Sequence, residues 1–526
     1  MVMYDVRGIQ KYIFRTAKIK DAIGASAIVE HIIEEALSCA VKKLNLQDRV
    51  ELEWFTKDGI LDYRDADLAV QVLYIGGGNA YAICESRELC LKINRIMARY
   101  IIENTYSLQL ATAIVEVTDD YTMDYADLMN EMSRVKAEMT LSKPLGALPV
   151  MAVEVKTGYP SSASPETGEL KDRAGDVGTE SILKLRREKS VRRNIDSQIK
   201  ILDNYTTRKG VDSTLAVVHI DGNNMGLRIR NLISKKKTYV DAVNEMRRIS
   251  YYINSSYQTV FKNMCTFFNE KTGARKEYQD KKTDDFVLKI LVAGDDITYV
   301  CNGKIALATV EYYCSEIAKY TMTGETDEKS MREYGFSVCA GVAYIGSHFP
   351  FHVGYDVAEA CCESAKDSAK LPENKNGERI GNWVDFQICK NIQARDLETM
   401  RAREYMTSYG EQLLARPYFI RVDSDAGWPI EKTDFRAFDI LKRNILYFQN
   451  EENIPRSFAK NLRNVYPQGK DKADMFLAFL ESRNWEMPDK TDELFLPGNE
   501  TVIAKYYDAL ELLDYYIDLD EIRGGE

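Results

Sequence analysis

The order of expected strands and helices repeats once along this chain, and the repeat constrains the fold more than any single motif. In the first copy, a short apolar strand ending near Asp5 leads into helical segments and then a hairpin, VQVLYIGGGNAYAICE. In the second copy, the strand LAVVHI ends at Asp221, and the later hairpin carries AGDD at its turn. Gly77 precedes Gly294 by 217 residues and Asp5 precedes Asp221 by 216, so the registers agree. The pattern predicts an α+β chain with two βαββαβα units.

The 526 residues are too many for one core of ordinary size, because domains usually hold about 100 to 200 residues. Apolar spacing predicts helices over 88–100, 125–139, 240–268, 305–320 and 355–370. The segment WVDFQIC reads as an edge strand, and the sequence after it shows helical spacing without a strand signal. We expect a first unit over 1–150, a linker or lid with a basic helix over 151–210, a second unit over 211–390 and an all-α domain over 391–526.

The net charge limits the class of ligand that the chain can bind, and the cysteine content indicates the cellular compartment. The formal net charge is -11, so the whole chain does not attract nucleic acid, and any phosphate site must be built locally. Small phosphorylated substrates therefore fit better than a long polynucleotide. The ten cysteines form no C-x-x-C pair, and no stretch of about 20 apolar residues occurs. We expect a cytoplasmic protein with reduced thiols and no contact with a membrane.

Three carboxylates are the candidate catalytic and metal-binding residues. Asp221 leaves a strand, and Asp295 and Asp296 stand at the hairpin turn. Paired strands lie about 4.8 Å apart, so these side chains can share one or two divalent cations. Oxygen ligands without nearby His or Cys favour Mg²⁺ or Mn²⁺, and a two-metal site suits transfer at an α-phosphate. An isolated Gly-Asp-Asp is usually only a turn, but here it follows a strand-end Asp and precedes a helical Ala-Lys.

Glycines, amides and lysines near these carboxylates are the expected nucleotide-binding groups. Glycine lets backbone N–H groups approach phosphate oxygens, and lysine on the helix ESAKDSAK supplies positive charge. His219 shares a strand face with Asp221, where we favour a structural, hydrogen-bonded role. The first hairpin lacks the acidic pair, so its turn suits either a phosphate cradle or a plain flexible hairpin. The expected nucleotide-binding residues are Gly222, Asn223, Asn224, Gly226, Gly294, Lys366 and Lys370, with Gly76, Gly77, Gly78 and Asn79 in the first hairpin.

Eight segments over about residues 1–390 occur in an order that is far more specific than any one of them. They are DVRGIQKYIF, GASA, GGGN, TGYPSS, HIDGNNMG, AGDDITYV, FSVCAGVA and ESAKDSAK. Together these segments resemble a known family, the large polymerase-cyclase subunit of type III CRISPR effector complexes and its stand-alone relatives. The resemblance implies two tandem ferredoxin-like palm domains, of which only the second keeps its catalytic carboxylates.

The resemblance also implies an activity and partners. Members join ATP by 3′-to-5′ transfer into cyclic oligoadenylate-type second messengers for antiviral signalling, and a downstream effector binds the product. Asp221, Asp295 and Asp296 would hold the metals, with one nucleotide on each palm. Other CRISPR-type subunits and guide RNA are the implied partners.

The sequence departs from the family in several places. Adjacent His-Asp ligands of a nuclease domain are missing, so DNA cleavage is not expected, and without zinc-type cysteine pairs neither is a structural zinc. The family's Gly-Gly-Asp-Asp is Ala-Gly-Asp-Asp here. Asn223 stands where an acidic residue is common, and Cys339 where Ser is frequent, which leaves base preference open.

Three functions remain open from the sequence. The first is an enzyme that makes a cyclic oligonucleotide or cyclic dinucleotide from ATP or another NTP. The second is a scaffolding subunit of a ribonucleoprotein, against which the acidic charge balance argues. The third is a mononucleotide cyclase or a nucleotide-conjugating enzyme, since one fold can activate different acceptors.

Overall fold

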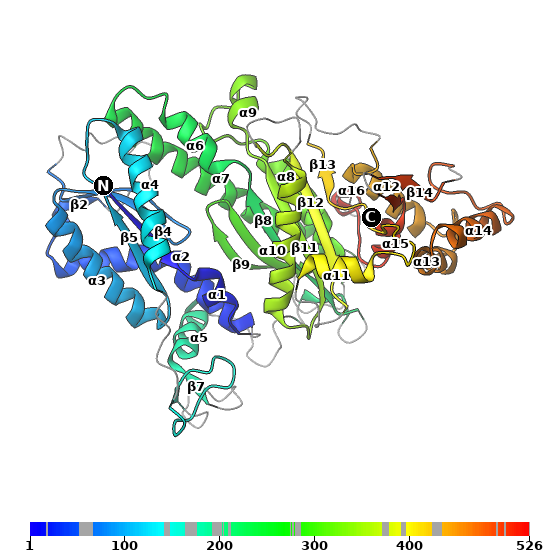
Figure 1. The fold of residues 1–526 in the computed structure, drawn as a ribbon, viewed down its shortest axis with the longest axis horizontal. Coiled ribbons are helices and arrows are strands. Elements are labelled where there is room, and N and C mark those ends of the chain that lie inside the picture. Colours follow the sequence, from blue (N-terminus) through cyan, green and yellow to red (C-terminus); the bar gives the residue numbers. More distant parts are fainter. Residues whose placement is uncertain are drawn as a thin grey trace.

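The computed structural model shows a mixed α+β chain with several sheets (Figure 1). It describes residues 1–16, 19–51, 67–140, 148–163, 176–191, 202, 205–208, 212–273, 275, 278, 286–370, 378–390, 396–422, 434–490, 493–498 and 501–524. Parts of the expected linker and the end of its basic segment fall outside these residues. No helix within the described ranges is both long and apolar enough to span a bilayer.

The first sheet has five strands in the order β2-β3-β4-β1-β5. The hydroxyl of Ser86 and the carboxylate of Asp120 accept hydrogen bonds from backbone N–H groups, which fixes where two of its helices begin. Its strands are β1 (Val2–Arg7), β2 (Val50–Glu51), β3 (Val70–Gly76), β4 (Asn79–Cys84) and β5 (Gln109–Ile114), and its helices are α1 (Ile9–Phe14), α2 (Ile19–Lys43), α3 (Arg87–Thr105) and α4 (Tyr121–Glu138).

A short connecting region follows, with strands β6 (Ser161–Ala163) and β7 (Val177–Gly178) and helix α5 (Thr179–Val191). Helix α5 packs along α2. Its Lys184 is buried and donates hydrogen bonds to the backbone oxygen of Tyr12 and to Glu180, both at 2.6 Å. The described part of the basic segment therefore begins inside the packed structure.

The second sheet has six strands in the order β13-β12-β11-β8-β10-β9 and lies at the centre of the molecule (Figure 1). Its strands are β8 (Thr214–Gly222), β9 (Val287–Ala293), β10 (Asp296–Asn302), β11 (Val338–Gly346), β12 (Asn382–Ile388) and β13 (Tyr418–Ile420). The helices of this region are α6 (Met225–Ile233), α7 (Tyr239–Gly273), α8 (Ala306–Ile317), α9 (Glu328–Tyr334) and α10 (Phe351–Ser368).

The predicted repeat is present in the strand order. The strands β3-β4-β1-β5 of the first sheet correspond to β9-β10-β8-β11 of the second, and every neighbouring pair in both runs is antiparallel. In each hairpin the register skips one residue of the first strand, Leu73 in β3 and Ile290 in β9, again 217 residues apart. The two halves therefore share a local irregularity as well as a topology. The five helices expected from the sequence correspond to α3, α4, α7, α8 and α10.

Each half of the chain packs a helix against the sheet of the other half. Helix α2 of the first half contacts β9, and helix α7 of the second half contacts β3. The ring of Phe14 stacks on Tyr355 of α10 with centroids 3.6 Å apart. The hydroxyl of Tyr239 on α7 donates a 2.9 Å hydrogen bond to Asp124 on α4. Each half thus covers part of the other, which fixes the two hairpins relative to one another.

Two expectations for the end of the chain are wrong. Strand β12 is not an edge strand, because β13 pairs with it antiparallel and all seven β12 residues are buried. The region 391–526 is not all-α, because it supplies β13 and the two-stranded sheet β14 (Phe495–Pro497) and β15 (Val502–Ala504). Strands of three residues are too short to show a period of two in the sequence. The helices here are α11 (Leu397–Glu404), α12 (Phe438–Gln449), α13 (Arg456–Val465), α14 (Lys470–Glu481), α15 (Tyr507–Glu511) and α16 (Leu519–Gly524).

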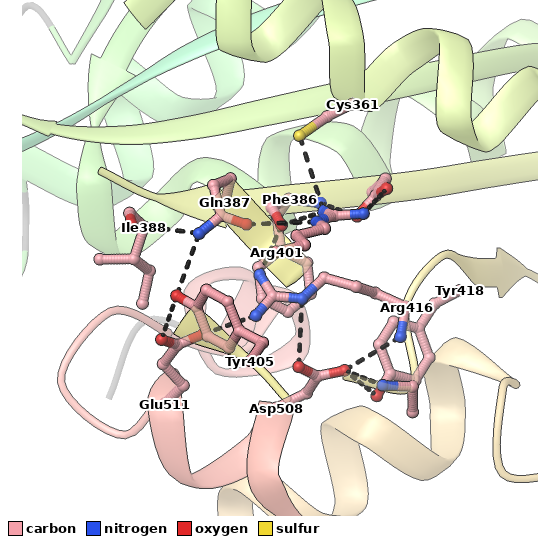
Figure 2. A network of polar contacts seen from close by, with 12 residues as sticks. Cys361, Phe386, Gln387, Ile388, Arg401, Tyr405, Arg416, Tyr418, Asp508 and Glu511 are labelled. Carbon is pink, nitrogen blue, oxygen red and sulfur yellow. Dashed lines mark hydrogen bonds and ion pairs between the residues drawn. The ribbon is translucent and has the colours of Figure 1, made fainter. Parts of the chain in front are cut away.

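A buried ion-pair network fastens this C-terminal region to the second sheet (Figure 2). Arg416 is buried and pairs with Asp508 at 3.1 Å and with Glu511 at 2.6 Å, both on α15. Arg401 on α11 donates two hydrogen bonds, of 2.8 and 2.7 Å, to the two carboxylate oxygens of Asp385 on β12. Because buried charges are costly when unpaired, these contacts hold α11 and α15 in fixed positions against the sheet.

Candidate functional site

Strand β8, the β9–β10 hairpin and helix α10 bring the three predicted carboxylates together. Asp221 stands one residue before the end of β8, which lies between β10 and β11. Ala293 pairs with Asp296, so the hairpin turn consists of Gly294 and Asp295. The negative charges of the three carboxylates act on one another, since Asp221 raises the pKa of both other groups. The sequence-predicted cluster therefore exists in space.

Lys366 of α10 is the cation of this cluster. Its Nζ lies 2.6 Å from Oδ2 of Asp221 and 2.5 Å from Oε1 of Glu363, and the residue is 6% exposed. Burial lowers the pKa of Lys366, but the charge of Asp221 and hydrogen bonds to both carboxylates raise it more, so the pKa lies above its ordinary value. The ammonium group is thus charged and held against the end of β8.

The hairpin carboxylates remain poorly compensated. Burial, followed by the charge of Asp221, raises the pKa of Asp295 to about 7. Burial, followed by the charges of Asp221 and Asp295, raises the pKa of Asp296 to about 8, although 36% of its side chain is accessible. Oδ1 of Asp296 is itself buried and accepts no hydrogen bond from any described residue. At neutral pH this cluster binds protons readily, because the charge of Lys366 lowers the two pKa values less than burial and Asp221 raise them.

His219 has the surroundings of a structural histidine. It is 4% exposed, and its Nδ1 lies 3.1 Å from Oγ1 of Thr298 and 3.5 Å from Oδ1 of Asp296. Burial lowers its pKa to about 4, so the ring is neutral near pH 7. The ring meets Tyr355 edge-on with centroids 5.8 Å apart. It packs beneath the cluster as an uncharged group.

Gly222 and Tyr257 form the floor of the cluster. A Cβ on Gly222 would lie 2.6 Å from the hydroxyl of Tyr257 and 2.8 Å from Cβ of Asp295, so no other residue fits without movement. The hydroxyl of Tyr257 is fully buried, and none of the residues that the structure describes forms a hydrogen bond with it. Burial, then the charge of Asp295, raises its pKa well above the ordinary value. Sequence reasoning missed Tyr257, because on α7 it follows the ordinary spacing of a core residue.

The turn of the first hairpin lies against the turn of the second. A Cβ on Gly77 would lie 3.6 Å from the backbone oxygen of Ala293, and a Cβ on Gly294 would lie 3.8 Å from the hydroxyl of Tyr74. The charge of Asp295 contributes, after burial, to a raised pKa of Tyr74. Tyr74 of the first sheet therefore reaches the carboxylate cluster of the second. The sequence offers a signal for Tyr74, because this residue stands two residues before Gly76, the first glycine of the hairpin.

The first half carries a partial copy of the cluster. Asp5 near the end of β1 pairs at 2.5 Å with Lys136 on α4, as Asp221 pairs with Lys366 on α10. Gly76 pairs with Asn79, so Gly77 and Gly78 form the turn, and Asn79 occupies the position that Asp296 has in the second hairpin. The aspartate–lysine pair is duplicated, whereas the hairpin carboxylates are not.

Other predicted nucleotide-binding residues are engaged elsewhere. The side chain of Asn223 donates a 2.9 Å hydrogen bond to the backbone oxygen of Gly381. The side chain of Asn224 donates to the backbone oxygen of Arg379 at 2.7 Å and accepts from its N–H at 2.9 Å. Both asparagines thus fix the segment before β12. Lys370 pairs with exposed Asp367 at 2.8 Å, and a Cβ on Gly226 would meet nothing within 4 Å.

The donor set suits a hard divalent cation, but the carboxylates are not arranged as a finished metal site. In the described part of the chain, no group of three or more His, Cys, Asp or Glu side chains is placed to hold a metal ion. One reason is that Lys366 occupies Oδ2 of Asp221. Among the described residues Oδ1 of Asp296 has no hydrogen-bond partner, and the charge of Lys366 does not offset the raised pKa values of the two hairpin carboxyls. Oxygen donors of this kind fit Mg²⁺ or Mn²⁺.

Comparisons with known proteins show a distant likeness. No family model and no curated protein matches the sequence. The chain is similar to a chain of the Csm1–Csm4 cassette in complex with AMPPNP, at 14% identity and a TM-score of 0.41, over 72% of this chain and 55% of that one. For the same cassette in complex with cA4 the identity is 14% and the TM-score 0.41, over 70% and 52%. For Csm1 in T. onnurineus the identity is 14% and the TM-score 0.41, also over 70% and 52%. The chain spans about half the length of these chains, so the likeness is one of partial fold.

Proposed function

We propose that this chain is a metal-dependent nucleotidyltransferase that joins ATP into a cyclic oligoadenylate-type or cyclic dinucleotide messenger, on two tandem ferredoxin-like palm domains. The observation that carries the proposal is the convergence of Asp221, Asp295 and Asp296 beside Lys366. Such a cluster costs free energy through mutual repulsion, and nothing in the fold requires it. The distant likeness to Csm1 chains agrees with a nucleotide-binding fold of this kind.

Each residue of the cluster has a part in the proposed reaction. Asp221, Asp295 and Asp296 would hold Mg²⁺ or Mn²⁺, and the bound metal would activate a ribose hydroxyl and neutralise the leaving pyrophosphate. Lys366 lies close enough to Asp221 to reach phosphate oxygens brought there. Gly222 keeps the floor open, because a side chain there would collide with Tyr257 and Asp295. The neutral ring of His219 adds no charge to compete with a cation.

The contact between the two hairpins favours a reaction at their junction. Tyr74 comes from the first sheet, and its hydroxyl lies against the Gly294 turn. A nucleotide held on the first half by Gly76, Gly77, Gly78 and Asn79 would lie next to the second hairpin. We place the acceptor or donor nucleotide there, which would give the first half a binding role without catalytic carboxylates of its own.

The activity is tested by incubating the purified chain with each NTP and Mg²⁺ or Mn²⁺ and identifying products by mass spectrometry. We expect ATP to give a cyclic oligonucleotide with release of pyrophosphate. The double substitution Asp295→Asn/Asp296→Asn removes the hairpin charges and should abolish product. Asp367→Asn is the matched control, because it removes a carboxylate on α10 that is 71% exposed.

A scaffolding role is the second candidate, favoured by the ion pair between Lys366 and Asp221. That pair satisfies Asp221 without a metal, and Asp5 and Lys136 form the same pair in the half that lacks the hairpin carboxylates. In this reading the palms are structural parts of a CRISPR-type ribonucleoprotein with other subunits and guide RNA. Absence of product with every NTP and both metals would favour it, as would assembly with such subunits that is unchanged by Asp295→Asn/Asp296→Asn.

A further inference from the structure

A cavity of about 570 Å³ lies beside the carboxylate cluster, at the ends of strands β11 and β12. This volume falls within the range of about 300 to 1,000 Å³ found for small-ligand pockets. Its walls come from α6, the end of α8, α9 and the segments that lead into β11 and β12. None of the carboxylates of the cluster lines it, so it is a separate space.

The cavity is lined by arginines more than by acids. Arg228, Arg332 and Arg379 face it, against Glu328 and Glu378. Arg332 already pairs with Glu328 at 3.1 Å. Glu378 acts on Arg228, so the lining keeps one net positive charge, and Arg228 and Arg379 are the guanidinium groups that a ligand would meet.

Arg379 has an unsatisfied hydrogen-bond donor, and Arg228 is a partly buried charge beside it. Nη1 of Arg228 donates a hydrogen bond to the backbone oxygen of Gly335, and burial lowers the pKa of its guanidinium, which still stays charged at neutral pH. Nε of Arg379 is buried and has no hydrogen-bond partner within the described ranges. A buried N–H without an acceptor is costly, and an anion in the cavity would supply the acceptor.

Apolar groups line the same space. Met331, Phe336, Ile380 and Val422 offer flat or flexible surfaces, and Ser337 and Asn382 add hydrogen-bonding groups. A plain phosphate site would not need the apolar part, and an apolar ligand would not need the arginines. The combination matches a nucleoside phosphate, whose base packs on apolar side chains while guanidinium groups bind its phosphates.

The cavity and the carboxylate cluster share a wall. Asn223 and Asn224 directly follow β8, one and two residues after Gly222, and they fix the segment from Arg379 to Gly381 that faces the cavity. The backbone N–H of Asn223 also donates to Ser337, a cavity residue, at 2.9 Å. A ligand that contacts this segment is therefore connected, through the hydrogen bonds of Asn223 and Asn224, to the strand that carries Asp221.

We propose that this cavity is a further nucleotide site, separate from the carboxylate cluster and from the first hairpin, where Arg228 and Arg379 bind the phosphates and Phe336 and Met331 pack against the base. The proposal deepens the proposed function, in that a nucleotidyltransferase would hold a nucleoside phosphate here as well as at its carboxylates. Binding at this site needs no metal, because the positive charge is supplied by the protein.

The test is calorimetric titration of the full chain with ATP in EDTA, with adenosine and inorganic phosphate as separate ligands. We expect ATP to bind without metal, and adenosine and phosphate each to bind more weakly, because each lacks half of the recognised groups. Arg379→Gln and Arg228→Gln should weaken ATP binding by about tenfold or more, since a hydrogen bond to a charged group contributes about 1.5 to 3 kcal/mol. Arg379→Lys, which keeps the charge, should lose less.

Two controls make the result specific. Arg230→Gln removes an exposed arginine from the same helix as Arg228 and should leave binding unchanged. Asp295→Asn/Asp296→Asn should retain metal-free ATP binding, which separates this site from the proposed activity. The inference is overturned if ATP does not bind in EDTA at millimolar concentration, or if Lys366→Gln abolishes that binding while Arg379→Gln leaves it intact. Turnover of NTPs with metal can succeed or fail independently of either result.

Discussion

Replacing Asp295 by asparagine should stabilise the protein in the absence of metal, although it removes a residue proposed to be catalytic. Burial and the charge of Asp221 raise the pKa of Asp295 to about 7, so the native state resists ionisation of this carboxyl. In the unfolded chain the same group ionises near 3.9. The ionised carboxylate therefore costs the folded state free energy that asparagine, which has a similar shape and no charge, does not cost.

The size of the effect follows from the two pKa values. Each pKa unit corresponds to about 1.4 kcal/mol, so a rise from about 3.9 to about 7 gives at most about 4 kcal/mol. Solvent reaches part of the Asp295 side chain and screens its charge, and asparagine leaves some hydrogen bonds changed. We expect a gain of about 1 to 2 kcal/mol at pH 8.

The sign of the pH dependence is fixed by the same shift. Below about pH 4 the carboxyl of Asp295 is protonated in both states and has no differential effect. As pH rises toward 7 the unfolded state loses its proton first, so the wild type loses stability, and above about pH 7 the loss is complete. Urea unfolding followed by circular dichroism in EDTA, at pH 5.5 and pH 8, should show a wider gap between Asp295→Asn and wild type at pH 8.

The control for this prediction is a carboxylate that lies outside the cluster. Asp367→Asn removes an exposed carboxylate and should change stability little. Under the proposed function, added Mg²⁺ or Mn²⁺ should stabilise the wild type more than Asp295→Asn, because the ion would bind the folded cluster and not the unfolded chain. If Asp295→Asn is no more stable than wild type at pH 8, or if the gap is equal at both pH values, the electrostatic account of the cluster is wrong.

Three further perturbations test other parts of the structure. Gly222→Ala should displace Tyr257 or Asp295 and lower the free energy of unfolding by about 1 to 3 kcal/mol, measured by urea titration, because its Cβ has no room. Arg416→Gln should lower it by about 3 to 5 kcal/mol in the same assay, since it leaves buried Asp508 without its cation and Glu511 with only Lys390 at 3.4 Å, whereas exposed Arg403→Gln should change it little. Lys366→Met removes a charge that lowers the pKa of the hairpin carboxyls, so the pH at which Mn²⁺ binds half-maximally should rise; an unchanged value would separate Lys366 from the cluster.

The order of the strands in the two hairpin-containing sheets was predictable from the sequence, whereas three short strands in the last part of the chain were not. The offset between Gly77 and Gly294 appears in space as two hairpins with the same turn length and the same register skip. Long helices were predicted because their apolar spacing extends over several turns. Strands β13, β14 and β15 were missed because three residues carry no period, and Val502–Ala504 stands at the start of an apparently helical run.

The charged residues of the candidate site were predictable from the sequence, whereas the side-chain contacts of its uncharged residues were not. Asp221 and the hairpin pair follow from strand ends, which topology brings together. Asn223 forms a hydrogen bond with Gly381, and Tyr257 points from α7 toward Gly222. The direction in which each of these side chains points depends on tertiary packing, which the local sequence does not specify. Asn223 holds the wall of the neighbouring cavity through its hydrogen bond to Gly381, and its expected role in nucleotide binding stays a prediction.

The duplicated aspartate–lysine pair also sets a limit on ion stoichiometry. In the first half, Asp5 and Lys136 form a neutral couple that has no need of a further ion. In the second half, the single ammonium of Lys366 is shared by Asp221 and by Glu363, whose side chain is 57% exposed and screened by water. Full ionisation of Asp221, Asp295 and Asp296 would therefore leave at least two negative charges without a cation, enough to take one divalent cation. A second cation would then have to arrive with its own counter-charge, which a triphosphate carries. Under the proposed function, metal loading should therefore proceed in two stages, the first intrinsic to the protein and the second dependent on nucleotide.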